Sequence, residues 1–223
     1  MRSSGIKRVE QKRIWKNPAN ERMDQHTWAC KRPSTGGSFA APLAVNKLAA
    51  RSELKMDIVI RSETEADIEA ISQVTRAAFE NHPYSNQTEV FIVHALRRAN
   101  ALTISLVAEV GNQVVGHIAF SPVTISDGSP GWYGVGPVSV LPELQRQGIG
   151  KALIHKGLSI LKASGAKGCL LVGDPGYYQR FGFKSIPDLV IDDVPQENVL
   201  TLPFEESKAS GRVIFHEGFA ANG

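Results

Sequence analysis

The turn within residues 135–151 constrains the fold of this chain more than any other segment. An apolar run ends at Pro142, a glycine-rich turn follows, and apolar residues then recur at helical spacing over residues 149–161. Glycine lets the backbone approach a ligand closely, and the first turn of a helix offers unpaired N–H groups and the positive end of the helix dipole. The segment therefore predicts a strand, an anion-sized loop and a helix.

The spacing of the glycines separates this loop from two better-known phosphate loops. A dinucleotide-binding turn needs Gly-x-Gly-x-x-Gly and a P-loop needs Gly-x-x-x-x-Gly-Lys-Ser/Thr, and neither pattern occurs. The chain instead has Gln145-x-x-Gly148-x-Gly150, with Arg146 and Lys151 as charged donors. Taken alone, this turn fits a pyrophosphate and equally an ordinary strand-to-helix connection.

A second block follows about twenty residues later. Cys169–Val172 is a short apolar run typical of a buried strand, and Gly-Asp-Pro-Gly then ends it. Pro175 can open a helix at its first position and Gly182 can close it, which leaves about one helical turn between them. The block ends in Tyr178-x-x-Phe-Gly-Phe183.

Both blocks together resemble the GNAT superfamily of N-acetyltransferases. The Gln145 turn is similar to the acyl-CoA signature of that family, and the segment from Tyr178 is similar to its Tyr-x-x-Leu-Gly-Phe block, in the same order. The resemblance covers residues 57–217. Gly136-Pro137 and the run from Gly116 to Pro122 are more particular, and resemble the bacterial YhbS-type branch.

The resemblance implies the GNAT acyl-CoA N-acyltransferase fold, which is a mixed α/β (α+β) fold. In it, helices flank a central, mostly antiparallel sheet with splayed central strands. The pattern of the residues agrees, with a Gly111-Asn112 hairpin signal and a capping box from Ser62 to Glu65. The expected strands include residues 57–61, 104–110, 114–125, 169–172, 199–202 and 212–216, and the expected helices end near residues 80, 100 and 164.

The family also implies where acetyl-CoA, the expected co-substrate, would bind. Its pantetheine arm would lie along the backbone of a strand, and its pyrophosphate would sit on the loop. Gly136-Pro137 is consistent with a bulge or splay in that strand, because proline cannot donate to a ladder. The residues carried over are Val138, Ser139 and Val140 for the arm, and Arg146, Gln147, Gly148, Ile149, Gly150 and Lys151 for the pyrophosphate.

Tyr178 is the candidate general acid. A phenol with a pKa of about 10 is protonated at neutral pH, and a departing thiolate has comparable basicity, about 8.5 for the cysteine side chain. Tyr177 is the alternative if the short helix is rotated, and a merely half-buried tyrosine is the structural alternative for either residue.

The general base stays open at this point. Glu80, His82 and Glu89 lie in or beside helices expected near the substrate entrance, and His117 lies on a strand. Solvated helix charges and a buried strand histidine are the structural alternatives, and many GNAT enzymes relay the proton through water. Where many relatives carry Asn, Asp174 stands here, so a cofactor contact by that Asn is not carried over.

The composition argues against a membrane protein, a disulfide-stabilised protein and a metal-binding protein. No run of 18 apolar residues occurs, so no membrane span is expected. Cys30 and Cys169 stand in different settings, which favours a reducing cytoplasm over a disulfide framework. The six histidines lack metal-ligand spacing, so no metal is expected.

The basic charge of the chain belongs to its first part. Residues 1–55 hold 12 Lys or Arg against 4 Asp or Glu, whereas residues 56–223 hold 13 against 18. We expect a disordered basic extension over residues 1–55, an acetyltransferase domain over residues 56–217 and a C-terminal tail over residues 218–223. The extension has three interpretations: a nucleic-acid-binding arm, a transit peptide, or a translated upstream region with Met56 as the true start. We favour the third.

The leading functional interpretation is an N-acetyltransferase. It would move an acetyl group from acetyl-CoA to a primary amine of a small molecule or protein by direct attack in a ternary complex. A CoA-sensing or partner-binding module without turnover is the alternative. Nucleic-acid binding is disfavoured because the basic residues of the extension are not clustered, and a homodimer is the oligomer that many GNAT proteins form.

Overall fold

The computed structural model of the protein describes residues 56–82, 85–206 and 209–223, so the predictions for residues 1–55 lie outside the described part. Its longer elements are β1 (Val59–Ser62), α1 (Ile68–Phe79), α2 (Glu89–Arg98), β2 (Ile104–Val110), β3 (Gln113–Ile125), β4 (Trp132–Val140), α3 (Ile149–Ala163), β5 (Gly168–Val172), α4 (Pro175–Tyr178), β6 (Leu189–Val190), β7 (Val199–Pro203) and β8 (Gly211–Phe215). Short 3-10 helices are η2 (Glu65–Asp67), η3 (Pro142–Leu144), η4 (Gln179–Phe181), η5 (Gln196–Asn198) and η6 (Glu217–Ala220).

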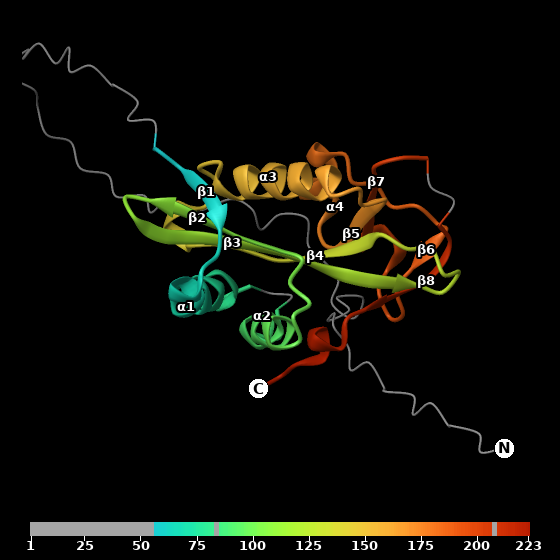
Figure 1. Ribbon diagram of the computed structural model, residues 1–223, viewed down its shortest axis with the longest axis horizontal. Coiled ribbons are helices and arrows are strands. Elements are labelled where there is room, and N and C mark those ends of the chain that lie inside the picture. The colour runs from blue at the N-terminus through green and yellow to red at the C-terminus, as the bar shows by residue number, and fades with distance from the viewer. Residues whose placement is uncertain (1–55, 83–84, 207–208) are drawn as a thin grey trace, which may run out of the picture. The chain divides into compact units, whose positions relative to one another are not determined.

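The strands form a mixed sheet in the order β1-β2-β3-β4-β5-β7, and β8 pairs with the far end of β3 and with β6 (Figure 1). Pairing is antiparallel except between β4 and β5 and between β6 and β8. Helix α3 covers one face of the sheet, while α1 and α2 cover the other (Figure 1). The predicted fold class is confirmed.

The β2–β3 hairpin forms where the sequence predicts it. Gly111 and Asn112 both have positive φ, 56° and 63°, as a two-residue turn of the primed type requires. Strand β3 is long, and its last residues pair with β8 rather than with β2. One strand therefore joins the two halves of the sheet.

Helix α3 lies close on β3 because glycine stands at two contact points. A Cβ on Gly116 would lie 3.0 Å from Leu153 Cδ1, and one on Gly157 would overlap the Phe120 ring. The predicted apolar face of α3 is buried, including Ile149, of which 1% is exposed. This packing fixes the start of α3 above the end of β4.

The first helix begins differently from the prediction. Ser62 still belongs to β1, where it pairs with Leu106, so the Ser62–Glu65 capping box is wrong. The box forms two residues later: the carboxylate of Asp67 accepts hydrogen bonds from the N–H of Thr64 at 2.7 Å and from its hydroxyl at 2.9 Å. The same spacing rule applies, because both pairs are three residues apart.

The C-terminal strands match the prediction in part. β7 and β8 form near the expected positions, and each pairs antiparallel with a strand of the main sheet. β8 also pairs in parallel with β6, a strand of two residues that the apolar pattern does not reveal. Part of the segment expected as a tail lies in η6, which packs against α2.

The described helices include none that is both long and apolar enough to span a bilayer.

Candidate functional site

The two central strands of the sheet separate at the candidate site. β4 and β5 pair in parallel only over Trp132–Gly134 and Gly168–Leu170. Beyond these residues β5 pairs with β7 alone. The second half of β4 therefore has an open edge, as the prediction of splayed strands expects.

A bulge lies at the point of separation. The β3–β4 register shifts between Ile118 and Phe120, and the Gly136-Pro137 peptide within it is cis. The shift accommodates one additional residue of β4 opposite β3. The prediction of a bulge at Gly136-Pro137 is confirmed.

The backbone of β4 after the bulge faces the opening at alternate residues. Leu141 N–H donates to the carbonyl of Val115 at 2.9 Å. In an antiparallel ladder, hydrogen-bonded and non-bonded pairs alternate, so the backbone of Ser139 also bonds to β3. The same alternation turns the backbone groups of Val138 and Val140 away from β3, toward the opening.

The three strand residues expected at the pantetheine arm are therefore not equivalent. The hydroxyl of Ser139 is buried and donates to Thr75 Oγ1 of α1 at 3.2 Å. Both its backbone and its side chain are engaged inside the protein. Val138 and Val140 are the residues that the structure brings to the open edge.

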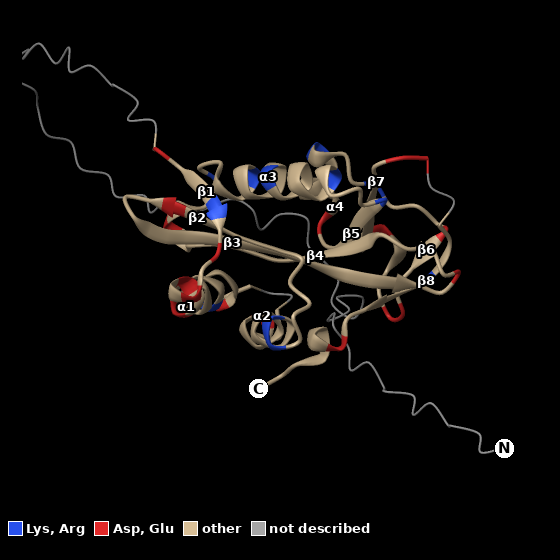
Figure 2. Cartoon of the chain, in the orientation of Figure 1, with Lys and Arg blue, Asp and Glu red and all other residues tan. Residues whose placement is uncertain are grey.

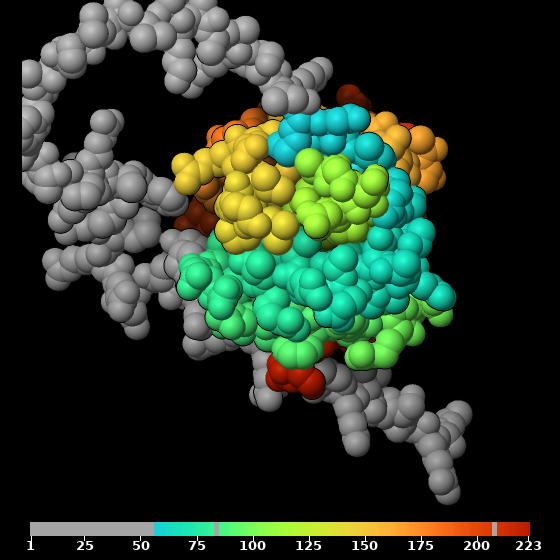
Figure 3. Space-filling view, turned by 90° about the vertical axis from the view of Figure 1, so that its left-hand side faces the viewer, coloured from blue at the N-terminus to red at the C-terminus, as the bar shows by residue number. Residues whose placement is uncertain are grey.

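The loop before α3 has the conformation that its glycines predict. Arg146 and Gly148 both have left-handed φ, 62° and 92°, and α3 follows directly. The N–H of Ala152 makes the first helical bond, to Gly148, so the N–H groups of residues 149–151 lie ahead of the helical ladder. This part of the chain, yellow in Figure 3, lies at the surface beside the tip of the β2–β3 hairpin.

Individual side chains of the loop differ in what they can offer a ligand. Arg146, Gln147 and Lys151 are exposed, and the Gln147 amide donates to the carbonyl of Glu143 at 3.1 Å. Ile149 is buried, so only its backbone faces the loop.

Gln145 has a role that the sequence did not reveal. Its amide Nε2 donates to the carbonyl of Val140 at 3.1 Å. The side chain thereby ties the loop to the end of β4. This bond spans only five residues, yet no helical or strand periodicity indicates it.

Tyr177 and Tyr178 lie next to each other but contact different elements beside the opening. A Cβ on Gly150 would lie 3.1 Å from Tyr177 Oη, which places this hydroxyl against the first turn of α3. A Cβ on Gly173 would lie 2.6 Å from the Tyr178 ring, which places that ring at the end of β5. The two rings meet edge to face, 4.9 Å apart.

Both phenols stay protonated at neutral pH. Burial raises the pKa of Tyr178 well above its ordinary value, and the neighbouring Tyr177 and Asp174 add to the rise. Burial also raises the pKa of Tyr177, although Arg180 opposes it. Each hydroxyl is therefore a hydrogen-bond donor in the folded protein.

Asp174, which stands where many GNAT proteins carry Asn, caps the short helix α4. Its Oδ1 accepts a hydrogen bond from the N–H of Gly176 at 2.8 Å, and Pro175 occupies the first helical position. The predicted proline start and the closure at Gly182, with φ of 90°, are both confirmed.

The candidate bases on the helices have different environments. Glu80 and His82 are exposed at the end of α1, and the His82 ring lies 5.7 Å from that of Phe79. Glu89 opens α2 and accepts hydrogen bonds from Ser85 with both oxygens, at 2.8 Å each.

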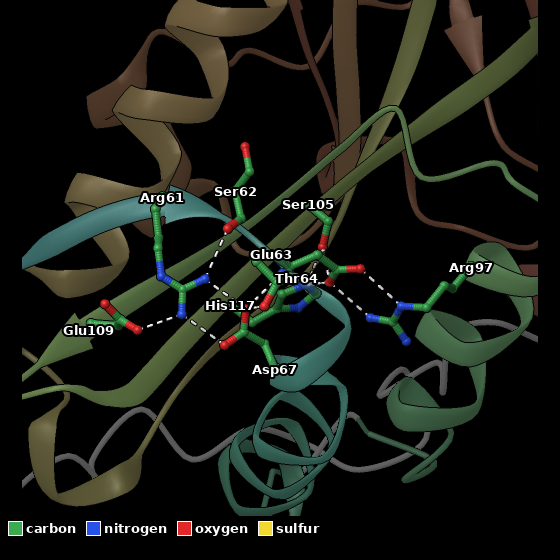
Figure 4. A network of polar contacts seen from close by, with 9 residues as sticks. All are labelled: Arg61, Ser62, Glu63, Thr64, Asp67, Arg97, Ser105, Glu109 and His117. Carbon is green, nitrogen blue, oxygen red and sulfur yellow. Dashed lines mark hydrogen bonds and ion pairs between the residues drawn. The ribbon is translucent and has the colours of Figure 1, made fainter.

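His117 belongs to a buried polar network on the α1/α2 face of the sheet (Figure 4). Its Nε2 lies 2.8 Å from the hydroxyl of Ser105, which in turn lies 2.5 Å from Glu63 Oε2. Arg97 holds the same carboxylate with two hydrogen bonds of 2.9 Å. His117 is fully buried, and its Nδ1 has no partner within the described ranges.

A half-open pocket lies away from the loop and from the tyrosines. A cavity of about 280 Å³ opens at the edge of β2, where β1 leaves the sheet. Its lining consists of Ser62, Glu63, Leu102, Thr103, Ile104, Ser105, Leu106 and Ile160. An elongated ligand that adds to a strand edge needs no such cavity, so we place the site at the opening.

Comparison with known families agrees with this geometry. Residues 102–185, which include the loop and both tyrosines, match the model of the acetyltransferase (GNAT) domain. The chain is 35% identical over 128 residues to the "Uncharacterized N-acetyltransferase YhbS" of Escherichia coli K12, an alignment that covers 57% of this chain and 74% of that protein.

Two solved structures are similar over most of the described residues. A GNAT family acetyltransferase from Brucella melitensis, in complex with acetyl-CoA, is 50% identical, with 74% of this chain and 99% of that chain covered and a TM-score of 0.66. YhbS from Escherichia coli, in complex with CoA, is 30% identical, with 75% and 94% covered and a TM-score of 0.69.

Proposed function

The chain belongs to the GNAT family of N-acetyltransferases, and from this premise we propose that it transfers the acetyl group of acetyl-CoA to a primary amine by direct attack in a ternary complex. Two relatives that are 50% and 30% identical were solved with acetyl-CoA and with CoA, which supports the choice of cofactor. The acceptor is the amine of a small molecule or of a protein.

One observation carries the proposal: donors of two kinds converge on a single opening. The open edge of β4 offers the backbone N–H groups of Val138 and Val140 and the carbonyl of Val138, whereas the carbonyl of Val140 already accepts from Gln145. The first turn of α3 offers unpaired N–H groups at residues 149–151, with Lys151 beside them. An extended amide-containing arm that ends in a diphosphate matches both.

The residues around the opening support a direct transfer. The neutral amine attacks the thioester carbonyl carbon, the carbon–sulfur bond breaks, and the thiolate takes a proton from Tyr178. The same apolar surroundings that raise the pKa of Tyr178 also raise that of a thiolate, so their proton affinities stay comparable. The amine proton leaves through water, and the backbone N–H of Val138 or Val140 stabilises the oxyanion.

The proposal also includes a cellular setting. We place the enzyme in the cytoplasm, because Cys169 is a free thiol and a reducing compartment keeps thiols free. A homodimer is the proposed oligomer, as in many members of the family.

Calorimetry with acetyl-CoA tests the cofactor. We expect micromolar binding by the full chain and its loss in Gly150→Glu, since the new carboxylate would stand in the loop against Tyr177 Oη. Ser159→Glu, at an exposed position of the same helix, is the matched control and should bind normally. If the folded wild-type protein does not bind acetyl-CoA, the proposal is refuted.

Tyr178→Phe tests the chemistry. We expect turnover to fall by about 10²-fold or more while acetyl-CoA affinity stays within about twofold, because only the proton donor is removed. Free thiol release with a panel of amines measures the turnover.

The same assay separates the enzyme from a CoA-sensing module. Binding of acetyl-CoA without transfer to any amine, together with no effect of Tyr178→Phe, would favour the sensor.

A further inference from the structure

Tyr177 has a position that the proposed acid chemistry does not explain. Its hydroxyl lies against Gly150, in the first turn of α3, rather than at the end of β5 where the Tyr178 ring lies. It makes no hydrogen bond within the part of the chain that the structure describes. The hydroxyl is not among the buried unpartnered side-chain atoms, so it stays accessible to a ligand from outside.

The ring of Tyr177 is held firmly enough to aim this hydroxyl. The Arg180 guanidinium carbon lies 5.0 Å from its ring centroid, and the rings of Tyr178 and Phe181 contact it edge to face at 4.9 and 5.6 Å. Aromatic and cation–π contacts of this kind limit the movement of the ring.

The charge state of the hydroxyl suits an anion. Burial raises the pKa of Tyr177, so the phenol is a neutral donor across the physiological range. The N–H groups of residues 149–151 are donors as well, and α3 directs its positive end to the same place. Several donors thus meet at Gly150 without an acceptor among the described residues.

We infer that Tyr177 is a cofactor-binding residue whose hydroxyl donates a hydrogen bond to the diphosphate of CoA, leaving Tyr178 as the general acid. Gly150 is then required for a second reason besides backbone approach. A methyl group there would lie 3.1 Å from Tyr177 Oη and would displace the hydroxyl from the first turn. This inference rests on the proposed use of acetyl-CoA.

The test compares Tyr177→Phe with Tyr178→Phe in the full chain by calorimetry. Two probes are used: acetyl-CoA and adenosine 3′-phosphate 5′-diphosphate, which carries the diphosphate without the pantetheine arm. We expect Tyr177→Phe to weaken both probes by about 10-fold to 100-fold, as the loss of a hydrogen bond to a charged group predicts. Tyr178→Phe should leave both affinities unchanged.

Turnover at saturating acetyl-CoA gives a second readout. Tyr177→Phe should raise KM for acetyl-CoA and keep kcat, whereas Tyr178→Phe should lower kcat and keep KM. Thermal melting of each variant verifies that it is folded, and the loss of only one hydroxyl favours that outcome.

Three results would overturn the inference. Tyr177→Phe could bind both probes as tightly as wild type, or it could weaken acetyl-CoA alone, which would move the contact to the pantetheine arm. A wild-type protein that binds neither probe would refute the proposed function together with this inference, whereas the first two results leave the proposed function intact.

Discussion

His117, the buried histidine on β3, shows how its neighbours determine the protonation state of a single side chain. The hydroxyl of Ser105 donates to Glu63, so it can accept only from His117, whose Nε2 must then carry the proton. Burial lowers the pKa of His117 from its ordinary value of 6.5, and the nearby Glu63 carboxylate does not offset this effect. The folded state therefore keeps the ring neutral.

The free energy of unfolding should fall as the pH drops below about 6.5. In that range the unfolded chain binds a proton at His117 that the folded chain refuses, so the slope is up to about 1.4 kcal/mol per pH unit. Urea denaturation at a series of pH values measures it. His117→Gln, which keeps a donor for Ser105 and does not titrate, should flatten this part of the curve.

His155→Gln is the matched control for that series, because His155 is exposed on α3. It should keep the wild-type slope. An unchanged slope in His117→Gln would show that another group is responsible.

Prediction from the sequence succeeds at this scale where one local motif carries the information. The loop from Arg146 to Lys151 and the Pro175 helix start were predicted because their partners lie a few residues away. The network around His117 was not, since Glu63, which lies beside His117, and Arg97, which binds Glu63, come from segments that only the fold brings together. The unequal roles of Val138 and Ser139 likewise depend on ladder register.

At the scale of elements, the contact between α3 and β3 determines where the anion-binding turn stands. Gly157 faces the Phe120 ring, and Gly116 faces Leu153 and Ile149. Glycine at both points lets the helix approach the sheet closely, so the start of α3 stands over the end of β4.

Gly157→Ala should destabilise the fold by about 1–3 kcal/mol, even though alanine is the better helix former. The added methyl group would overlap the Phe120 ring. This ring is fully buried, so it has no free space into which it could move. The urea midpoint measures the effect. Ser159→Ala, at an exposed position two residues later, should be neutral or slightly stabilising; equal behaviour of both variants would contradict the packing argument.

Helices, strands and turns were predicted correctly where residues close together in the sequence carry the pattern. The Gly111-Asn112 turn and the apolar face of α3 are both local patterns, and both were predicted. The helix start at Thr64 was missed because Ser62 offers the same spacing, and only the pairing of Ser62 with Leu106 decides between them. β6 exists through its pairing with β8 and has no signal of its own.

At the scale of the whole molecule, charge is unevenly distributed within residues 56–223 as well as between them and the basic residues 1–55. Residues 144–187, which carry α3, β5 and α4, hold seven Lys or Arg against one Asp. The rest of residues 56–223 holds six Lys or Arg against seventeen Asp or Glu. Figure 2 shows blue residues along α3 and red residues on α1 and on the loops near β6, β7 and β8, with further blue residues on α2 and β1.

Acetyl-CoA binding should therefore weaken as salt is added. Raising KCl from about 50 to about 500 mM shortens the screening length to a few ångströms, and we expect the Kd to rise about threefold to tenfold. Calorimetry at a series of KCl concentrations measures it. Pantetheine, which has no phosphate, should show no such dependence, and an equal response of both ligands would contradict the charge argument.

The separation of β4 from β5 also affects the stability of the sheet. In the proposed complex the pantetheine arm serves as a missing strand, so the cofactor completes the sheet as well as feeding the reaction. Without it, an unsatisfied edge lies in the middle of the protein, where a strand from another chain could dock. We therefore expect CoA added during purification to reduce self-association of the protein.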